Sequence, residues 1–418
     1  MSRYISSTVT PSTDSLRGKR VAVIVFSYFP SDPRVFRAAR ALAGAGAEVD
    51  LFCLRKSNEA GLMEPASERV SGVNVTRAST KKSRAGKLVY VKQYLAFTGL
   101  AFVWLTRRSL KRRYALVHVH NMPDFLVFSA VGAKLLGSRI VLDLHDPMPE
   151  VFIAKYELKP GHWLLRLLRI IEKLSIRFAD LVLTPNLAFR KLFASRSGPE
   201  EKIRIIMNSP LEEVFPLRAP EKLPSRKQGA RFVLMYHGTL VERHGLHTAI
   251  SALAELEDSL PGLVFYIYGA ETPYLTETVL PLIEELDLRD RVRYVGERSQ
   301  EVIARAIAEC DLGIVPNLRT VFTEINLPTR IFEYLALGKP VIVPQTPGIG
   351  DYFDSDNMLF FQWGNEGEEE RDLAAKIRWV FEHPAEVRSL VEKGQEVYRG
   401  HVWQMQQEAL LKAVSGLL

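Results

Sequence analysis

Short apolar runs alternate with stretches of helical periodicity along the whole chain, and this alternation most restricts its possible folds. In the first half, one expected strand contains the continuous apolar run VAVIVF. Strands that are apolar at every position are typical of parallel sheets covered by helices on both faces. The strands expected in this half are residues 20–27, 48–54, 73–77, 115–120, 139–144, 181–184 and 203–207.

The pattern stops at a polar, proline-containing segment, residues 211–230, and then starts again. The second set of expected strands is residues 231–237, 263–268, 291–295, 311–315, 340–344 and 358–361. Because 418 residues exceed one typical domain, we predict an α/β protein with two Rossmann-like, doubly wound parallel sheets facing a central cleft. The expected organisation is a disordered tail (1–18), a first domain (19–210), a linker (211–230), a second domain (231–395) and a helix crossing back to the first domain (396–418).

The stretch LPTRIFEYLALGKPVI, residues 327–342, predicts a short amphipathic helix followed by a buried strand. Pro328 stands near the helix start and Gly338 just past its end, which is the usual placement of these residues. The first turn of a helix presents unpaired backbone N–H groups, which suit a phosphate, and Arg330 adds a cation there. Glu333 follows one turn later and can bind a diol such as a ribose. Phosphate and ribose together indicate a nucleotide.

Ligands of doubly wound sheets bind beyond the carboxyl ends of the strands, so the loops there are the candidate sites. In the first half, three such loops carry Asp32 and Arg34; His118, His120, Asn121 and Asp124; and Asp143, His145, Asp146 and Glu150. In the second half, the corresponding loops carry Gly238, Thr239, Arg243, His244, Gly245 and Gly269.

Three of these motifs, in their order along the chain, resemble the retaining glycosyltransferases of the GT-B fold, specifically glycosyltransferase family 4. TRIFEYLALGKPVI resembles the donor-binding helix of that family, HGTLVERHGL its phosphate loop and LDLHDPMPE its acceptor-side histidine loop. The resemblance covers about residues 19–418. It implies an acceptor-binding first domain and a second domain that binds a nucleotide diphosphate sugar. It also implies metal-independent transfer of a hexose-type sugar to a carbohydrate or lipid-linked acceptor, and suggests bacterial envelope, capsule or exopolysaccharide synthesis.

The chain departs from the family pattern at two places. The family shows two glutamates separated by seven residues, but counting back from Glu333 reaches Ile325, and Glu324 is one residue off. Either Glu324 serves with a shifted loop, or Asn326 or a backbone group contacts the sugar instead. The arginine and lysine of the family's phosphate loop fall at Thr239 and His244.

The departing diphosphate gains negative charge, which fixed cations and backbone N–H groups stabilise in a dry site. We assign this role to Arg243 and Arg330, although both can also be ordinary surface charges. The remaining donor-binding prediction consists of Glu333, which can alternatively be a solvated acid, together with Gly238, Thr239, His244, Gly269, Leu327 and Thr329.

On the acceptor side, His145 is placed to hydrogen-bond the donor sugar or the developing oxocarbenium region. Asp146 either orients the acceptor hydroxyl or caps the next turn. Asp32 and Arg34 either touch the acceptor or form a helix entry. His118 and His120 share one side of a strand, so one of them is expected to be structural, and we assign His120 and Asn121 to acceptor binding. His118, His120 and Asp143 match no strong metal-ligand spacing, so no metal is expected.

Residues 81–113 hold ten cations and no acid, whereas the whole chain carries +7. The rest of the chain is therefore about −3 (+7 less these ten), and the basic character is local. Leu88, Val91, Leu95, Phe102 and Trp104 lie among these cations, which predicts an interfacial helix on anionic lipid. A similar segment, residues 163–178, can be either interfacial or core-covering, and we read it as a helix covering the core. No nucleic-acid motif accompanies the basic segment.

The sequence indicates a reducing compartment, because Cys53 and Cys310 are the only cysteines, and it shows no secretion signal. We expect a cytoplasmic enzyme, peripheral on the inner face of the cytoplasmic membrane. Two alternatives remain: a nucleotide-sugar epimerase of the same fold, and a non-catalytic partner subunit that binds nucleotide or glycan. No G-x-S-x-G, Walker A or G-x-G-x-x-G pattern occurs, which argues against a hydrolase, a P-loop enzyme and a nicotinamide enzyme.

Overall fold

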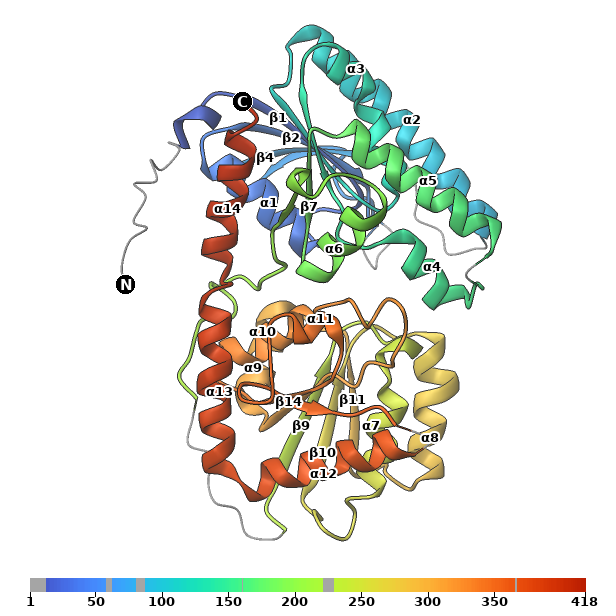
Figure 1. The fold of residues 1–418 in the computed structure, drawn as a ribbon, viewed down its shortest axis with the longest axis vertical. Helices are drawn as coiled ribbons and strands as arrows, with labels where there is room; N and C mark the ends of the chain where they lie inside the picture. The colour runs from blue at the N-terminus through green and yellow to red at the C-terminus, as the bar shows by residue number, and fades with distance from the viewer. Residues whose placement is uncertain (1–12, 58–61, 80–86, 160, 221–228, 365–366) are drawn as a thin grey trace. The chain divides into compact units, whose positions relative to one another are not determined.

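The computed structural model describes residues 13–57, 62–79, 87–159, 161–220, 229–364 and 367–418 (Figure 1). The chain forms two compact units. Unit 1 consists of Met1–Pro185, Phe189–Met207 and Gln404–Leu418, and unit 2 of Asn186–Ala188 and Asn208–Trp403. Each unit is built on a mainly parallel sheet with helices on both faces, so the predicted α/β class is confirmed.

Unit 1 contains an eight-stranded sheet in the order β3-β4-β2-β1-β5-β6-β7-β8. All neighbouring strands are parallel except β3 and β4. Strand β3 was not predicted, because this edge strand is mostly polar and largely exposed and so forms no apolar run. The strands are β1 (Arg20–Tyr28), β2 (Glu48–Leu54), β3 (Ser67–Val70), β4 (Val73–Ala78), β5 (Leu116–His120), β6 (Arg139–Asp143), β7 (Leu181–Thr184) and β8 (Ile203–Ile205).

Helices cover both faces of this sheet, with α1 and α14 on one side and α2 and α5 on the other (Figure 1). The strands between them are buried at nearly every position, as the apolar runs predict. The helices are η1 (Thr13–Leu16), α1 (Pro33–Gly44), α2 (Lys87–Lys111), η2 (Asp124–Ala130), α3 (Val131–Leu135), α4 (Met148–Tyr156), α5 (Trp163–Phe178), α6 (Leu187–Arg196), η3 (Glu200–Lys202) and α14 (Trp403–Ser415).

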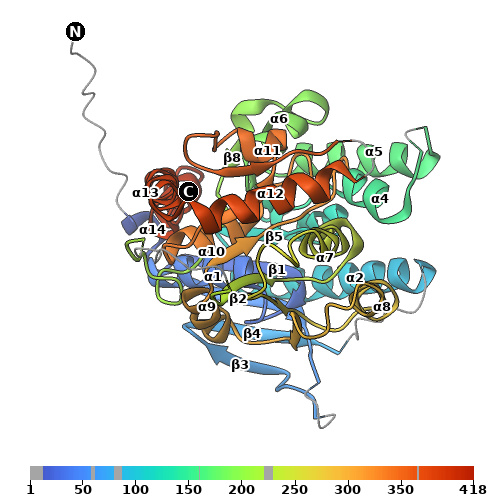
Figure 2. The same cartoon turned by 90° about the horizontal axis from the view of Figure 1, so that it is seen from below.

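Unit 2 contains a six-stranded, all-parallel sheet in the order β11-β10-β9-β12-β13-β14. Its strands are β9 (Phe232–His237), β10 (Leu263–Tyr268), β11 (Val292–Gly296), β12 (Leu312–Ile314), β13 (Val341–Pro344) and β14 (Leu359–Phe361). Helices α9 and α10 lie on one side of the sheet and α7 and α8 on the other (Figures 1 and 2). The helices are η4 (Glu242–His244), α7 (Leu246–Ala254), η5 (Leu275–Val279), α8 (Leu280–Glu285), α9 (Gln300–Glu309), α10 (Thr329–Ala336), α11 (Pro347–Gly350), α12 (Glu368–Glu382) and α13 (Pro384–Arg399).

The strand order of each sheet reverses at one point. In unit 2, the chain moves outward from β9 to β11 and then returns to β12 on the other side of β9. In unit 1, the corresponding reversal lies between β1 and β5. Loops diverge at such a point, and ligands of doubly wound sheets bind there. The fold therefore selects the carboxyl ends of β9 and β12 and those of β1 and β5.

Three expected boundaries are corrected. The ordered chain begins before residue 19, because η1 includes the fully buried Leu16, and residues 1–12 lie outside the described part. The first half of the expected linker packs on unit 2, where the Arg218 N–H donates to the Ala336 carbonyl at 2.7 Å and Phe215 is buried. The expected single helix at 396–418 is two helices, α13 and α14, because the chain turns after α13. None of the described helices combines the length and apolar character needed to cross a bilayer.

Candidate functional site

Helix α10 forms where the sequence predicts it and lies at the strand-order reversal of unit 2. Pro328 caps its start and Gly338, with φ of 71°, follows its end. The Tyr334 hydroxyl donates a hydrogen bond of 2.8 Å to the Met235 carbonyl, which fastens the helix to β9. Arg330 and Glu333 are three residues apart and therefore share a helix face.

Glu333 faces the last residue of β9. Its Oε2 lies 3.3 Å from Nε2 of His237, and the Glu333 side chain is 14% exposed. Burial, and then the positive charge of Arg330, lower the pKa of His237 to about 3. The imidazole is therefore neutral near pH 7.

Arg330 lies against the loop that follows β9. Its guanidinium carbon is 4.7 Å from the centre of the Tyr236 ring, a cation–π arrangement. A Cβ placed on Gly238, whose φ is 128°, would lie 3.2 Å from the same carbon. The Nη1 atom is buried and has no hydrogen-bond partner among the described residues. A buried donor on a cation is costly unless a ligand satisfies it, so the arrangement suits an anion.

The phosphate loop predicted at residues 238–245 is shaped by His244. The buried His244 Nδ1 lies 2.7 Å from the Thr239 carbonyl oxygen and 3.1 Å from the Tyr236 hydroxyl. Burial, then Arg330, lower the pKa of His244 to about 3. Gly245 has φ of 63°, and a Cβ there would lie 2.0 Å from the Pro316 carbonyl oxygen, so only glycine fits. Nδ1 of His244 therefore has its partners within this loop and at the end of β9.

The other predicted donor-side residues lie around these groups. Gly269 directly follows β10 and lies close to the loop after β9. A Cβ on Gly269 would lie 2.3 Å from the Gly238 carbonyl oxygen. Leu327 is buried just before α10, and Thr329 is its half-buried first residue. The Arg243 guanidinium lies 5.7 Å from the Phe322 ring centre.

The off-register Glu324 forms an ion pair with Arg319. Its side chain is 31% exposed, so the carboxylate is accessible but already has a partner. Its carbonyl accepts a hydrogen bond of 2.7 Å from Gly348, which fixes the backbone of this loop. Asn326, the alternative sugar contact, is half-buried two residues later.

Two residues near the site were not predicted from the sequence. His237 is the final residue of a buried strand and directly precedes Gly238. This position at the carboxyl end of a strand could have identified His237 as a candidate from the sequence. Asn317 follows β12 and is 2% exposed, with its Oδ1 buried and without a hydrogen-bond partner among the described residues. His237 lies at the carboxyl end of β9, and Asn317 lies on the loop that follows β12.

In unit 1, four candidate residues form a buried charge network at the ends of β5 and β6. Asp143 accepts hydrogen bonds of 2.7–3.1 Å from Arg34, whose Nη1 also donates to the Ile206 carbonyl at 3.0 Å. Asp143 Oδ2 lies 3.2 Å from His120 Nδ1 and 3.7 Å from His118 Nε2. Burial alone would raise the pKa of Asp143, but Arg34 and the histidines hold it well below its usual range.

The two histidines share one side of β5, as predicted, with ring centres 4.3 Å apart. Burial, then the neighbouring His118, lower the pKa of His120 to about 4. Arg34 and His120 are thus buried with partners inside the protein, which suits support of the loops better than the expected acceptor contact. Among the described residues, only His118, His120 and Asp143 place three potential metal-ligand atoms within 4.8 Å. Arg34 already occupies both carboxylate oxygens and puts a positive charge beside them.

The remaining acceptor-side candidates lie on the neighbouring loops. The buried Asn121 side chain accepts from the His145 N–H at 3.1 Å and donates to the Asp146 carbonyl at 2.7 Å, so it positions that loop. His145 and Asp146 are themselves half-buried, and His145 Nδ1 has no hydrogen-bond partner among the described residues. Asp32 is the N-cap of α1 and accepts from the Val35 N–H at 3.3 Å, the helix-entry role.

The basic segment matches the expected surface only in part, since Val91, Leu95 and Phe102 are 51%, 58% and 41% exposed. Arg108 and Arg112 lie 3.4 Å and 2.8 Å from carboxylates of β2, those of Asp50 and Glu48. Trp104 stacks on Phe52 with ring centres 5.1 Å apart, so it packs inward instead of marking an exposed interfacial face. Lys81, Lys82 and Arg84 lie outside the described residues, as does the Leu88 side chain.

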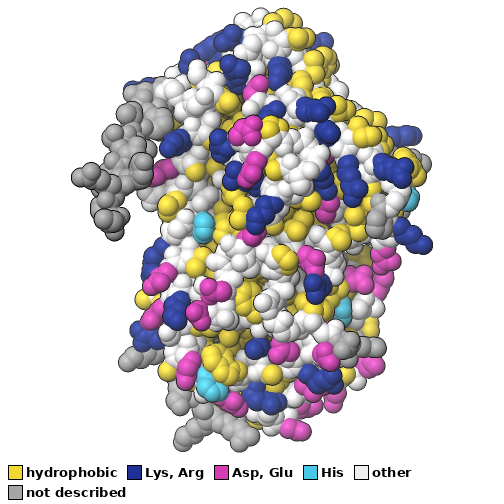
Figure 3. Space-filling view, viewed as in Figure 1, with side chains coloured by type: hydrophobic (Ala, Val, Ile, Leu, Met, Phe, Trp, Pro, Cys, Tyr) yellow, Lys and Arg dark blue, Asp and Glu magenta, His cyan; other side chains and the backbone are white. Residues whose placement is uncertain are grey.

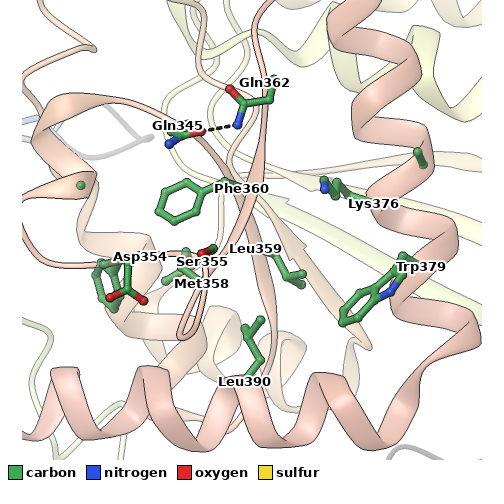
Figure 4. Close-up of a pocket in the computed structure, with 13 residues that line it drawn as sticks. Gln345, Asp354, Ser355, Met358, Leu359, Phe360, Gln362, Lys376, Trp379 and Leu390 are labelled. Atoms are coloured by element: carbon green, nitrogen blue, oxygen red, sulfur yellow. Dashed lines mark hydrogen bonds between the residues drawn. The ribbon is translucent and has the colours of Figure 1, made fainter.

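A cavity of about 750 Å³ lies elsewhere in unit 2 (Figure 4). It is bordered by β14, α12 and α13, with Phe360, Trp379 and Leu390 among its apolar lining and a hydrogen bond from Gln362 to Gln345 at its edge. Lys376 is the one cation among its described lining residues. None of the groups around Arg330 lines it, so it does not compete as the anion site.

Comparison with known proteins gives matches along most of the chain. Residues 31–209 match the glycosyl transferase 4-like domain family, and residues 219–397 match the glycosyl transferases group 1 family. A chitobiosyldiphosphodolichol beta-mannosyltransferase of Eremothecium gossypii is 25% identical over 392 residues, covering 84% of this chain and 78% of that protein.

Two further comparisons bear on the site. The amylovoran biosynthesis glycosyltransferase AmsK of Erwinia amylovora is 28% identical over 176 residues, 42% of each protein. The crystal structure of Anabaena Alr3699/HepE in complex with UDP-glucose has a TM-score of 0.67 at 17% identity, covering 95% of this chain and 99% of that chain. At this identity the structural likeness shows the fold, which is GT-B.

Proposed function

This chain belongs to the group 1 glycosyltransferases of the GT-B fold, and on that premise we propose the reaction it catalyses. It moves a hexose-type sugar from a nucleotide diphosphate sugar to a carbohydrate or lipid-linked acceptor, with retention of anomeric configuration. The reaction requires no metal, because cations of unit 2 take the place of one at the diphosphate.

The observation that carries the proposal is the group formed by Arg330, Glu333 and His237 at the strand-order reversal of unit 2. It combines a guanidinium whose buried Nη1 has no hydrogen-bond partner among the described residues with a carboxylate that lies beside a neutral imidazole. The cation suits the diphosphate, and the carboxylate suits the vicinal hydroxyls of the ribose. A UDP-glucose complex of a protein with this fold supports a nucleotide sugar as the ligand class.

The leaving diphosphate gains negative charge as the sugar bond breaks. Arg330 and Arg243, with the backbone N–H groups of Gly238, Thr239 and residues 327–329, stabilise that charge in the transition state. Preorganised donors of this kind contribute most of the rate in many enzymes, at about 3–4 kcal/mol for a single donor. Gly269 and Leu327 shape the walls, and Thr329 adds a hydroxyl.

The acceptor is proposed to bind unit 1. His145 and Asp146 are half-buried on the loop after β6, with the His145 Nδ1 lacking a partner among the described residues. Asp146 then orients the acceptor hydroxyl, and His145 hydrogen-bonds the transferred sugar. Asp32 remains a proposed contact beside its role as a helix cap.

The proposed biological setting is bacterial envelope or exopolysaccharide synthesis at the inner face of the cytoplasmic membrane. AmsK is a relative named for amylovoran biosynthesis, and the mannosyltransferase relative is named for a diphosphodolichol-linked acceptor. A lipid-linked acceptor is met at a membrane surface, where Arg107, Lys111 and Arg113 of the basic segment contribute positive charge.

The first experiment is a thermal-shift screen against nucleotide diphosphates and nucleotide sugars. A ligand that binds only the folded protein raises Tm, so the preferred base emerges before the acceptor is known. The preferred radiolabelled nucleotide sugar is then incubated with acceptor extracts, and the anomeric configuration of the product is read by NMR. Failure of every nucleotide diphosphate to raise Tm overturns the proposal.

The stereochemical measurement matters because the mannosyltransferase relative is named for a β-linked product. A product with the donor's anomeric configuration supports retention, and the opposite configuration excludes it while leaving glycosyl transfer intact. Conversion of the nucleotide sugar without acceptor indicates the epimerase alternative.

The non-catalytic partner is the second candidate, and the ion pair between Glu324 and Arg319 favours it, since a family-like glutamate would otherwise be free for the sugar. Tight nucleotide binding without turnover in any acceptor extract supports that candidate.

A further inference from the structure

Helix α5 carries an exposed apolar stripe. Trp163, Leu167, Ile170 and Leu174 are 67%, 43%, 56% and 48% exposed. Their spacing of four, three and four residues places them on one helix face. The core is covered by a different face, which consists of Leu165, Leu168, Glu172, Ser175 and Ile176. The helix covers the core, as expected, and it also presents this apolar stripe to solvent.

A row of cations runs beside the stripe on the same exposed surface. All of them are exposed: Arg166, Arg169, Lys173 and Arg177. The one acid of the helix, Glu172, is fully buried. Within the part of the chain that the structure describes, none of the four cations forms an ion pair, in contrast to Arg108 and Arg112 of α2.

The orientation of α5 is fixed by a buried network on its inner side. Arg196 Nη2 lies 2.6 Å from Glu172 Oε2, and the same guanidinium binds Glu150 of α4 at 2.6 Å and 2.8 Å. Ser197 also donates to Glu172. Because rotation of α5 would break these contacts, the helix cannot turn its apolar stripe into the core.

We propose that the exposed face of α5 is a membrane-docking surface, which inserts its apolar stripe into an anionic lipid bilayer while its cations bind lipid phosphates. Figure 3 shows basic and apolar side chains gathered over α5. The inference concerns unit 1 alone and does not depend on the proposed reaction.

The chemistry of the face favours a bilayer over other anionic partners. A nucleic acid would leave four exposed apolar side chains without a partner, whereas an interfacial helix buries them at the boundary between headgroups and acyl chains. Four unpaired cations complement anionic lipid, each adding attraction that salt screens. Trp163, at the start of the helix, has the apolar body and polar N–H that favour this boundary.

Co-sedimentation of the full chain with vesicles tests the proposal. Wild-type protein is expected to bind vesicles that contain phosphatidylglycerol at least tenfold more tightly than pure phosphatidylcholine. Arg166→Glu/Arg169→Glu should weaken that binding about tenfold or more. The matched control, Arg371→Glu/Lys393→Glu, changes net charge equally at exposed positions of unit 2 and should bind within about twofold of wild type.

The apolar stripe is tested without changing charge. Leu167→Gln/Ile170→Gln should weaken binding about tenfold even in high salt, because insertion is not screened.

Leu110→Gln/Lys111→Glu changes the exposed end of α2. If only that α2 variant loses binding, α2 is the docking surface and the proposal is overturned.

Insertion itself is read from fluorescence. Vesicles with brominated acyl chains should quench part of the wild-type tryptophan emission, and Trp163→Phe should lose that part. Unchanged quenching in Trp163→Phe overturns insertion. Vesicle binding by Leu167→Gln/Ile170→Gln that equals wild-type binding also overturns insertion. Binding to single-stranded RNA at equal affinity, abolished by the same arginine reversals, would instead indicate a nucleic-acid surface.

Discussion

Oε2 of Glu333 lies 3.3 Å from Nε2 of His237, so the carboxylate one turn into α10 faces the last side chain of β9. Burial and Arg330 keep the pKa of His237 at about 3, so the imidazole beside this carboxylate is neutral near pH 7. The pair joins the two elements that diverge at the strand-order reversal of unit 2.

Replacing Glu333 by Gln should reduce sugar transfer about 100-fold while Tm stays near the wild-type value. A hydrogen bond to a charged group contributes about 1.5–3 kcal/mol, and the variant removes the charge but keeps the shape. The measurement is kcat/KM with the preferred nucleotide sugar. Glu301→Gln, an exposed glutamate of α9, is the control and should leave kcat/KM unchanged. Wild-type transfer by Glu333→Gln would remove the ribose assignment.

Replacing Arg330 by Gln should lower kcat more than it raises KM, by about 100-fold to 1,000-fold. The reason is that the guanidinium matters most when the leaving diphosphate gains charge. Arg330→Lys should recover only part of the rate, because an ammonium lacks the planar fork. Arg305→Gln, at an exposed position of α9, serves as the control. A change confined to KM would show that Arg330 only binds the ground state.

Replacing Gly238 by Ala should reduce transfer by pushing Arg330 out of place, since the new Cβ would lie 3.2 Å from its guanidinium carbon. The φ of 128° adds strain of about 1–3 kcal/mol. Gly367 also has a positive φ, 80°, but a Cβ there meets nothing within 4 Å. Gly367→Ala should therefore lose some stability and keep full activity. Equal loss of activity in both variants would mean that strain alone is responsible.

Replacing Arg34 by Met should destabilise the protein by about 3–5 kcal/mol, because the buried Asp143 carboxylate loses its main cation. The double variant Arg34→Met/Asp143→Leu should recover much of that loss, because both charges are then gone. Urea unfolding followed by circular dichroism measures the difference. If the double variant is the less stable of the two, the network contributes more than charge compensation.

Acid should destabilise unit 2 through its buried histidines. The pKa of His237 is lowered to about 3 in the folded state, whereas an unfolded histidine titrates near 6.5. The unfolded state therefore binds more protons between these values, so the free energy of unfolding falls as pH decreases from about 6.5 toward 3. One such group gives a slope of up to about 1.4 kcal/mol per pH unit.

The variant His237→Gln should flatten this slope by up to that amount, as measured by urea unfolding between pH 7 and pH 4. Val343→Ala is the control, because it removes a buried methyl pair without a titratable group. Its curve should lie below the wild-type curve and run parallel to it. An unchanged slope in His237→Gln would contradict the assigned cause.

Most of the fold follows from local sequence. The strands of both sheets and the limits of α10 were predictable because burial on two faces gives continuous apolar runs, and proline and glycine mark helix ends. Edge strand β3 was not predictable in this way, since its polar side chains face solvent. The break between α13 and α14 was missed because helical periodicity continues on both sides of it.

The candidate site could be predicted only where its functional residues lie on one continuous segment of the chain. Glu333 and Arg330 stand on one helix and are visible in the sequence, but their partners His237 and Tyr236 come from a strand about 95 residues earlier. The predicted basic face of α2 loses part of its charge to Glu48 and Asp50, acids far away in the chain. Such pairings depend on the tertiary fold.

The membership of α14 in unit 1 has a consequence for biosynthesis. The Gln406 side chain accepts the Met207 N–H at 2.8 Å, which joins the far end of the chain to the last strand region of the first unit. While unit 2 emerges from the ribosome, unit 1 of the nascent chain already has all strands of its sheet but still lacks α14. Unit 1 begins first but is completed only after unit 2 has been synthesised, so the docking of α14 waits until residues 404–418 have left the ribosome.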